Sequence, residues 1–266
     1  MKTEDVARYW EGNAEAWTRQ ARAGYDVYRD ALNTPAFLDM LPQVSGLAGI
    51  DLGCGEGGNT RKLAERGARM TGIDVAPTFI RHATEAEAAE PLGVTYLLAD
   101  AHALPFGDGA FDFATAFMSL MDMPEPEKAI KEAGRVIAPG GFLQFSILHP
   151  CFVPPYRKTI RRMDGSTRAI EVGDYFNETY GHVDRWHFSA LPHAERATVA
   201  AFEVPRFHRT LTTWVDMIGA AGLMVEKLGE PYASEEVAKA EPIVEDTRVT
   251  PIFLHVRARK LRDFRD

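Results

Sequence analysis

Residues 49–59 read G-I-D-L-G-C-G-E-G-G-N, and this stretch decides the fold. A short apolar segment from Leu47 to Leu52 precedes four glycines, and a helical pattern begins at Thr60. Glycines permit positive φ angles and let a ligand approach the main chain without meeting a Cβ atom. The first N–H groups of a helix can donate to an anionic group. The stretch therefore predicts a buried strand, a tight turn and a helix start that bind a nucleotide-like molecule.

The glycine spacing alone leaves two cofactor classes open. Gly53, Gly55 and Gly58 fit the G-x-G-x-x-G pattern of dinucleotide sites. Asp51 favours S-adenosylmethionine (SAM), because a carboxylate suits the cationic amino group of its methionine part and would repel a pyrophosphate. A second acidic residue, Asp74, ends the next apolar segment, where ribose hydroxyls are held in either class.

Four further motifs follow in order along the chain. They are G-I-D at 72–74, A-D-A-H-A-L-P-F at 99–106, F-D-F-A-T-A at 111–116 and R-V-I-A-P-G-G-F-L at 135–143. Together with D-L-G-C-G-E-G at 51–57, they resemble the class I SAM-dependent methyltransferases, in particular the small-molecule branch with a methyltransferase type 11-like domain. The resemblance is strong over residues 45–148 and loose over the last sixty residues.

The pattern of elements predicts an α/β fold. Strands at 48–52, 69–73, 94–98, 111–117 and 142–148 alternate with helices at 59–66, 77–89 and 125–137. This alternation implies right-handed crossovers and a parallel sheet. The resemblance adds two closing strands, near 224–231 and 252–260. It thus implies a Rossmann-like, seven-stranded, mostly parallel sheet whose last strand is antiparallel, with helices on both faces.

We expect a single domain built from four parts. These are an N-terminal helical lid at 1–44, a SAM-binding core at 45–149, a substrate cap inserted at 150–208 and a C-terminal completion of the core at 209–266. The lid should contain three helices. In the cap, 171–176 and 185–188 are predicted as short strands that could pair with each other, and 232–249 is predicted as a surface loop.

The resemblance assigns cofactor contacts to residues near the carboxyl ends of the strands. It implies that Asp74 holds the ribose hydroxyls, Val75 packs against adenine, and Asp100 with the Ala101 N–H meets the adenine edge. The alternative for both aspartates is capping of the turn that follows each strand. The full set of assigned residues is Asp51, Gly53, Cys54, Gly55, Asn59, Asp74, Val75, Asp100, Ala101, His102 and Phe117.

A second set of residues is assigned to the methyl acceptor. Aromatic rings with a few cationic groups suit a small, partly apolar molecule, although the same rings could only pack the helices onto the sheet. Asp122 and Ser119 could bind substrate, or Asp122 could cap a helix. The assigned acceptor residues are Tyr9, Trp10, Tyr25, Ser119, Met121, Tyr175, Trp186, His187 and Arg206.

His149 is the candidate catalytic base. It follows the fifth predicted strand, so it should point to the rim of the active site. An imidazole has the right unperturbed pKa to take a proton near neutral pH. The alternative is a histidine with a structural role.

The composition indicates the cellular compartment and the classes of binding partner to expect. The chain has 266 residues, a formal net charge of -8 and a pI near 5.5, which argues against a nucleic-acid partner. The polar start predicts no secretory signal, and no run is apolar enough for a membrane span. Two distant cysteines without zinc spacing fit a reducing cytoplasm and no metal site. A homodimer remains open.

The sequence therefore predicts a SAM-dependent methyltransferase (EC 2.1.1.-). It would move a methyl group to an O, N or C atom of a small, partly apolar or aromatic acceptor and release S-adenosylhomocysteine. Two alternatives stay open: a protein that binds SAM for a non-methylating or regulatory role, and an NAD(P)-dependent oxidoreductase. Asp51 and the A-D-A-H-A-L-P-F segment argue against the second.

Overall fold

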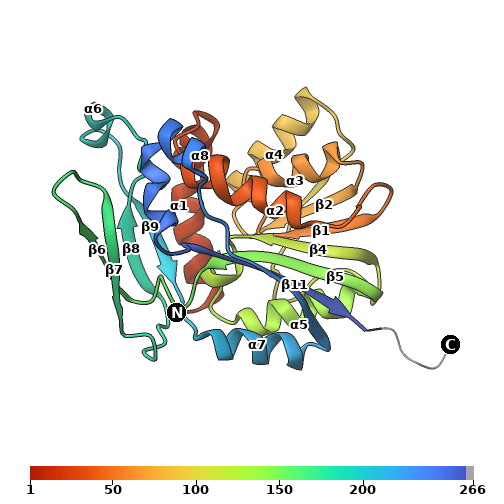
Figure 1. The fold of residues 1–266 in the computed structure, drawn as a ribbon. Coiled ribbons are helices and arrows are strands. Elements are labelled where there is room, and N and C mark those ends of the chain that lie inside the picture. The colour runs from red at the N-terminus through yellow and green to blue at the C-terminus, as the bar shows by residue number, and fades with distance from the viewer. Residues whose placement is uncertain (262–266) are drawn as a thin grey trace.

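The strands of the central sheet lie in the order β10-β11-β5-β4-β1-β2-β3 (Figure 1). Strand β11 is antiparallel to both of its neighbours, and the other six strands are parallel to one another. The predicted fold class is therefore confirmed. The strands are β1 (Ala48–Leu52), β2 (Arg69–Asp74), β3 (Thr95–Leu98), β4 (Phe111–Phe117), β5 (Ile137–Leu148), β10 (Leu223–Gly229) and β11 (Phe253–Lys260).

Helices cover both faces of this sheet. In the computed structural model, which describes residues 1–261, α2, α3 and α4 lie on one face and α5 and α7 on the other (Figure 1). Residues 262–266 of the predicted C-terminal part lie outside the described residues. These helices are α2 (Thr34–Met40), α3 (Gly58–Glu65), α4 (Pro77–Ala89), α5 (Pro126–Val136) and α7 (Leu211–Ala220). No helix within residues 1–261 is long and apolar enough to cross a membrane.

The N-terminal segment is helical, as predicted, and its three helical elements are α1 (Thr3–Arg22), η1 (Arg29–Asn33) and α2. Helix α1 leads to a π-helical turn, η1, which runs directly into α2. Helix α1 crosses the sheet at the carboxyl end of the parallel strands (Figure 1). Single π-turns occur often at functional sites, and η1 contributes two side chains to the cavity described below.

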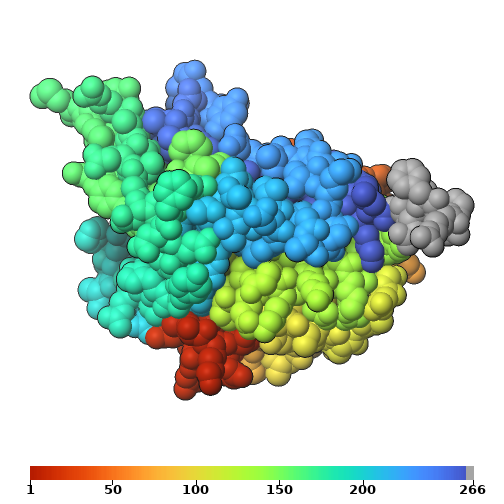
Figure 2. Space-filling model, turned by 90° about the horizontal axis from the view of Figure 1, so that it is seen from below, coloured from red at the N-terminus to blue at the C-terminus, as the bar shows by residue number. Residues whose placement is uncertain are grey.

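The cap segment, residues 150–208, contains two hairpins. Strand β6 (Tyr156–Arg161) pairs with β7 (Thr167–Gly173), and β8 (His182–Trp186) pairs with β9 (Phe202–Arg206). A short helix, α6 (His193–Arg196), joins β8 to β9. Figure 2 shows the green to teal atoms of this segment gathered at one end of the molecule.

The predicted pairing of 171–176 with 185–188 was therefore wrong. Strand β7, which includes residues 171–173, pairs with the preceding strand β6. The turn between them contains Asp164 and Gly165, and Gly165 has φ 84°. A D-G pair is a strong hairpin signal. Pairing of β8 with β9 instead buries Phe202 and Val204 against α1. Each strand thus pairs with a neighbour that the sequence reading had missed.

The predicted surface loop at 232–249 was also wrong. The segment forms α8 (Glu235–Ala240) and a 3₁₀ helix, η3 (Pro242–Arg248). The Ser234 hydroxyl caps α8 by accepting a hydrogen bond from the Val237 N–H. Val244 and Thr247 are buried, and the Tyr28 hydroxyl donates to the Ile243 carbonyl over 2.6 Å. The segment therefore packs onto the N-terminal segment.

The centre of the sheet tolerates no side chain at Gly49. A Cβ atom there would lie 2.3 Å from Cζ of Phe113 and 2.7 Å from Sδ of Met70, the partners of Gly49 on β4 and β2. Phe113 is fully buried and stacks on Phe142 with ring centroids 5.2 Å apart. The ring of Phe113 therefore has no free space into which it can move.

We expect Gly49→Ala to lower the free energy of unfolding by about 1–3 kcal/mol, because the added methyl overpacks the sheet. Gly12→Ala on α1 is the matched control. A Cβ there meets nothing within 4 Å, so the change should stabilise the helix by about 0.5–1 kcal/mol. Urea unfolding measures both changes. An unchanged midpoint for Gly49→Ala would contradict the packing described here.

Candidate active site

A cavity of about 430 Å³ lies at the carboxyl ends of the parallel strands. Its wall is formed by the turns after β1, β2, β3 and β4, by α1 and η1, and by the cap strands β8 and β9. In parallel α/β sheets, ligands bind at this end of the strands. The volume falls in the range of small-molecule sites. One part of the wall is polar and rich in backbone groups, and another part is aromatic.

The glycine turn after β1 forms the floor of the polar part. The N–H groups of Gly53 and Cys54 both donate to the Ile73 carbonyl, over 2.9 and 2.8 Å. Gly53 has φ 71°, and a Cβ on it would lie 2.6 Å from Cβ of Ser119. A Cβ on Gly55 would meet nothing within 4 Å. The backbone at Gly55 is thus open to an approaching ligand.

Asp51 is buried at the end of β1 and lies in the cavity wall. Its Oδ2 accepts a hydrogen bond from the Thr60 hydroxyl over 2.6 Å, and its Oδ1 accepts one from the Thr115 hydroxyl over 2.8 Å. Burial raises the pKa of Asp51 to about 6, and the two hydroxyls oppose this rise. A cationic ligand group nearby would favour the ionised carboxylate.

Asp74 ends β2 and holds the backbone of two turns. Its Oδ2 accepts from the Gly55 N–H and its Oδ1 accepts from the Ala76 N–H, each over 2.9 Å. Burial raises the pKa of Asp74 to about 6, opposed by these hydrogen bonds. A carboxylate offers about four acceptor positions, so turn capping leaves room for ribose hydroxyls. The two interpretations from the sequence are therefore compatible.

Asp100 follows β3 and forms a pair with His102. Nδ1 of His102 lies 2.6 Å from Oδ1 of Asp100, and the His102 N–H donates to the same oxygen over 2.9 Å. The hydrogen bond from the imidazole lowers the pKa of Asp100. The Asp100 side chain is 41% exposed, so it stays accessible to a ligand at the mouth of the cavity.

The structure brings every residue assigned to the cofactor to the wall of this one cavity. They are Asp51, Gly53, Cys54, Gly55, Asn59, Asp74, Val75, Asp100, Ala101, His102 and Phe117. Their individual roles in binding remain predictions.

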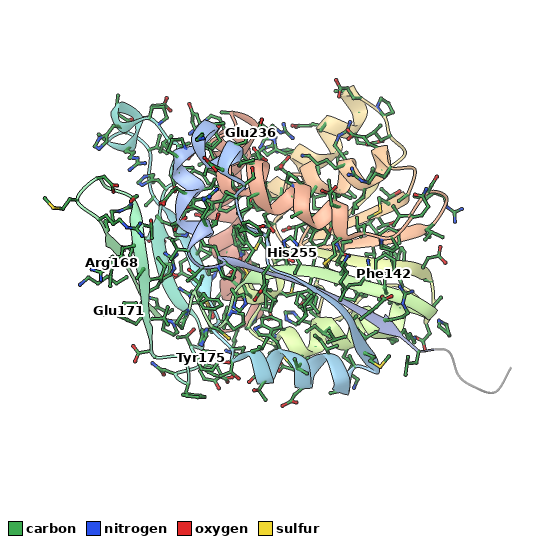
Figure 3. All side chains as sticks on the ribbon, in the orientation of Figure 1. Phe142, Arg168, Glu171, Tyr175, Glu236 and His255 are labelled. Carbon is green, nitrogen blue, oxygen red and sulfur yellow. The ribbon has the colours of Figure 1, made fainter. Side chains whose placement is uncertain are left out.

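The residues assigned to the acceptor divide into two groups. Six line the cavity: Trp10, Tyr25, Ser119, Met121, Trp186 and Arg206. Three do not: Tyr9, Tyr175 and His187. Tyr9 precedes Trp10 on α1, and successive helical residues point about 100° apart. The Tyr175 hydroxyl accepts from the Leu211 N–H at the start of α7 (Figure 3), and Nε2 of His187 lies 3.0 Å from the Val199 carbonyl.

The aromatic wall is larger than the sequence indicated. Trp10 and Trp17 lie two turns apart on α1 with ring centroids 5.3 Å apart. Trp17 meets Phe188 of the cap segment at 4.8 Å and Trp186 at 5.5 Å. Neither Trp17 nor Phe188 is among the residues assigned to the acceptor from the sequence. Their contact depends on the pairing of β8 with β9, which was not foreseen.

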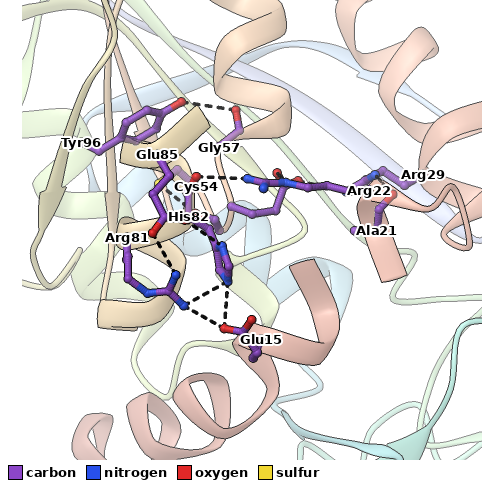
Figure 4. A network of polar contacts seen from close by, with 12 residues as sticks. Glu15, Ala21, Arg22, Arg29, Cys54, Gly57, Arg81, His82, Glu85 and Tyr96 are labelled. Carbon is purple, nitrogen blue, oxygen red and sulfur yellow. Dashed lines mark hydrogen bonds and ion pairs between the residues drawn. The ribbon is translucent and has the colours of Figure 1, made fainter. Parts of the chain in front are cut away.

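Polar contacts join α1, which lines the cavity, to α4 of the core. Oε2 of Glu15 accepts from Nη2 of Arg81 over 2.8 Å and lies 2.9 Å from Nε2 of His82, both on α4 (Figure 4). The carboxylate of Glu11 accepts from the N–H and the hydroxyl of Thr78. Helix α1 is therefore joined to the core at several points along its length.

Arg29 is a charged residue of the cavity wall that the sequence analysis did not assign to the site. The Arg29 guanidinium on η1 contacts Asp30 over 2.8 Å and Glu56 over 3.4 Å. Asp26 is nearby, and burial raises its pKa to about 6. The π-turn aims Arg29 toward the glycine turn. No pattern in the sequence signals such a turn.

The structure does not support His149 as the base. Its Nε2–H donates to Oε1 of Glu230 over 2.8 Å, and its Nδ1 accepts from the Cys151 N–H over 3.2 Å. The ring also packs against Phe152. Leu148 faces the cavity, and the next residue of an extended chain points to the other side. His149 does not line the cavity, and both of its nitrogens are engaged.

The predicted resemblance to the class I SAM-dependent methyltransferases is confirmed, because the fold and a family match both agree with it. Residues 50–145 match the family described as "Methyltransferase domain". A SAM-dependent methyltransferase from Mesorhizobium loti has a similar structure, with a TM-score of 0.67 and 26% identity, over 85% of this chain and 96% of that chain. SAM is the cofactor of this class.

Curated relatives match over part of their length. Demethylmenaquinone methyltransferase of Thermus thermophilus is 44% identical over 96 residues, which are 35% of this chain and 44% of that protein. Malonyl-[acyl-carrier protein] O-methyltransferase of Pectobacterium atrosepticum is 28% identical over 171 residues, 64% of this chain and 65% of that protein. The chain thus matches less than two thirds of these relatives, and their acceptors differ in chemistry.

We expect His149→Gln to lower the free energy of unfolding by about 1 kcal/mol, because it disturbs two hydrogen bonds. The affinity for SAM should stay within twofold of the wild type, since the side chain lies outside the cavity. Urea unfolding and calorimetric titration measure the two quantities. A variant with unchanged stability but greatly weakened SAM binding would contradict this structural role.

Proposed function

We propose that this protein transfers the methyl group of SAM to a small, partly apolar or aromatic acceptor and releases S-adenosylhomocysteine. One observation carries the proposal. A single cavity joins the complete set of predicted cofactor residues to an aromatic wall built from α1 and the cap segment. Cofactor and acceptor would thus share one enclosed space, as direct transfer requires.

The residues present fit the cofactor. Asp74 keeps acceptor positions free for ribose hydroxyls, and the open backbone at Gly55 allows close approach. Asp51 would favour the cationic amino group of the methionine part, and Asp100 with Ala101 would meet the adenine edge. When bound, SAM supplies an activated methyl group on a sulfonium.

This chain's own contribution would be to orient the acceptor and exclude water. Trp10, Trp17 and Trp186 provide flat apolar surfaces that hold a small ring in a fixed orientation. Positioning of this kind supplies a large share of the rate of a displacement whose leaving group is already activated. The proposed acceptor is therefore a molecule of one or two rings or a short apolar chain.

The first experiment is calorimetric titration of the protein with SAM, S-adenosylhomocysteine, NAD and NADP. The proposal expects the first two to bind and the nucleotides not to bind. Binding of NAD or NADP alone would overturn it. Labelled SAM with a panel of small acceptors then tests transfer, and tight SAM binding with no transfer to any acceptor would favour a non-methylating role.

We expect Asp74→Asn to weaken SAM binding roughly 10- to 100-fold, because hydrogen bonds to a charged carboxylate are lost. Asp216→Asn is the matched control, since Asp216 is exposed on α7. Calorimetric titration measures both affinities. Wild-type affinity in Asp74→Asn would refute the ribose assignment.

SAM affinity should rise with pH through about 6. The pKa values of Asp51 and Asp74 are raised to about 6, so both carboxyls are protonated in the free protein at pH 5. If binding requires the ionised forms, affinity falls by roughly tenfold per group for each pH unit below 6. Titrations between pH 5 and 7.5 measure this slope. An affinity that does not change over this range would contradict it.

A further inference from the structure

Asp122 is a buried carboxyl that the proposed cofactor site does not use. It ends the 3₁₀ turn η2 (Leu120–Asp122), is 6% exposed and lies in the cavity wall. Among the described residues, no group donates a hydrogen bond to its side chain. Buried polar side chains almost always have such a partner, so an unpartnered carboxyl at a cavity wall points to a ligand.

The backbone places Asp122 next to the glycine turn. After β4, Met118 has φ 53°, which is unusual for a residue other than glycine. The Ser119 hydroxyl then donates to the Leu52 carbonyl over 2.6 Å, and Ser119 stands directly over Gly53. One turn later, the Asp122 N–H donates to the Ser119 carbonyl over 3.0 Å. Asp122 is thus held beside the end of the cavity assigned to the methionine part of SAM.

Two charged residues of the cap segment face Asp122. They are Asp184 on β8 and Arg206 on β9. The Phe207 N–H donates to the Met121 carbonyl over 3.2 Å and so ties β9 to η2. Arg206 is engaged elsewhere, because its Nη2 donates to the Val153 and Pro154 carbonyls and its Nη1 lies 3.7 Å from Asp184. It therefore makes no ion pair with Asp122.

We propose that Asp122 is the general base that takes the proton of the acceptor, and that the acceptor is therefore a phenol, an alcohol or an N–H compound that keeps its proton at neutral pH. This inference rests on the proposed methyl transfer. A phenol or an N–H heterocycle would present its proton to Asp122 while its ring lies between the tryptophans. The acceptor would thus be held by the aromatic wall and oriented by one carboxylate.

The step balances without a further reactant. The lone pair of the acceptor O or N forms the bond to the methyl carbon, and the bond from that carbon to sulfur breaks. Sulfur keeps the bonding pair and becomes the neutral thioether of S-adenosylhomocysteine. The acceptor proton moves to the Asp122 carboxylate, which returns it to water before the next turnover.

The environment of Asp122 suits this role. Burial raises its pKa well above the usual range of a carboxyl, Asp184 raises it further, and Arg206 opposes the rise. A base works best when its pKa lies near the operating pH. A carboxylate with a raised pKa is therefore a better proton acceptor than an ordinary surface aspartate.

The test compares proton release on binding of SAM and of S-adenosylhomocysteine. Only SAM carries the sulfonium, whose positive charge would favour ionisation of a nearby carboxyl. Calorimetry in two buffers of different ionisation enthalpy counts the protons. A pH of 7.5 lies above the pKa values of about 6 of Asp51 and Asp74, so these two contribute little.

We expect SAM to release more protons than S-adenosylhomocysteine in the wild type and in the surface control Asp216→Asn. The excess should be lost in Asp122→Asn. An excess that persists in Asp122→Asn, or no excess in the wild type, would overturn the proposal for Asp122 alone. Failure of both compounds to bind would instead overturn the proposed function.

A second measurement uses labelled SAM with a panel of small phenols, N–H heterocycles and carboxylic acids. The proposal expects methylation of phenols or heterocycles, and Asp122→Asn should lower this rate by roughly 10²- to 10⁴-fold. SAM affinity should fall far less than the rate. Ionisation of Asp122 should make the wild-type rate rise with pH, and this rise should be absent in Asp122→Asn. Methylation of carboxylic acids alone, or an equal rate in Asp122→Asn, would overturn the proposal.

Asp122→Asn should remain folded. The Asp122 carboxyl accepts no hydrogen bond from the described residues, so its loss removes no stabilising contact. The amide of the variant does not ionise, so the variant also avoids the cost of burying an ionisable group. Its thermal midpoint at pH 7.5 should equal or exceed that of the wild type. The raised pKa means that the folded state binds the Asp122 proton more tightly than the unfolded state does. The free energy of unfolding of the wild type therefore falls as pH rises from the pKa of this carboxyl in the unfolded state to its pKa in the folded state. A lower midpoint in the variant would indicate a structural role for Asp122 instead.

Discussion

The rest of the structure depends on the attachment of the glycine turn to the neighbouring strand. The Ile73 carbonyl accepts hydrogen bonds from both Gly53 and Cys54. These two bonds bring the ends of β1 and β2 together, so Asp51 and Asp74 face the same cavity. On the other side, the close contact of Gly53 with Ser119 fixes the start of η2. One turn of glycine backbone thus determines where the predicted cofactor residues and Asp122 lie.

A second constraint is the burial of carboxyl groups at the strand ends. Asp51 and Asp74 are each stabilised by two hydrogen bonds from the protein, yet burial still raises their pKa values to about 6. A ligand with a cationic group and hydroxyl donors would relieve this unfavourable burial. Asp122 has no hydrogen bond from the described residues. The polar part of the cavity is therefore held ready for a ligand of complementary charge.

The apolar part of the cavity is assembled from distant segments. Trp17 of α1 packs against Trp186 and Phe188 of the cap segment. The Asn13 side chain donates to the Glu203 carbonyl over 2.8 Å and so joins α1 to β9. The Mesorhizobium loti protein shares the overall fold, and the family match spans residues 50–145, which include neither α1 nor the cap segment. Acceptor choice is proposed to lie in this part, which the family match does not include.

The sequence by itself determined the order of the core strands and helices along the chain, the glycine turn, and a set of residues that the fold brings to one cavity wall. These are local features, because the carboxyl ends of parallel strands always meet at one edge of the sheet. Only the tertiary structure decided the hairpin pairing of the cap segment, the burial of residues 232–249 and the direction of His149. It also showed that the Asp122 carboxyl accepts no hydrogen bond from residues 1–261. Each of these depends on contacts between residues far apart in the chain, which a local pattern does not record.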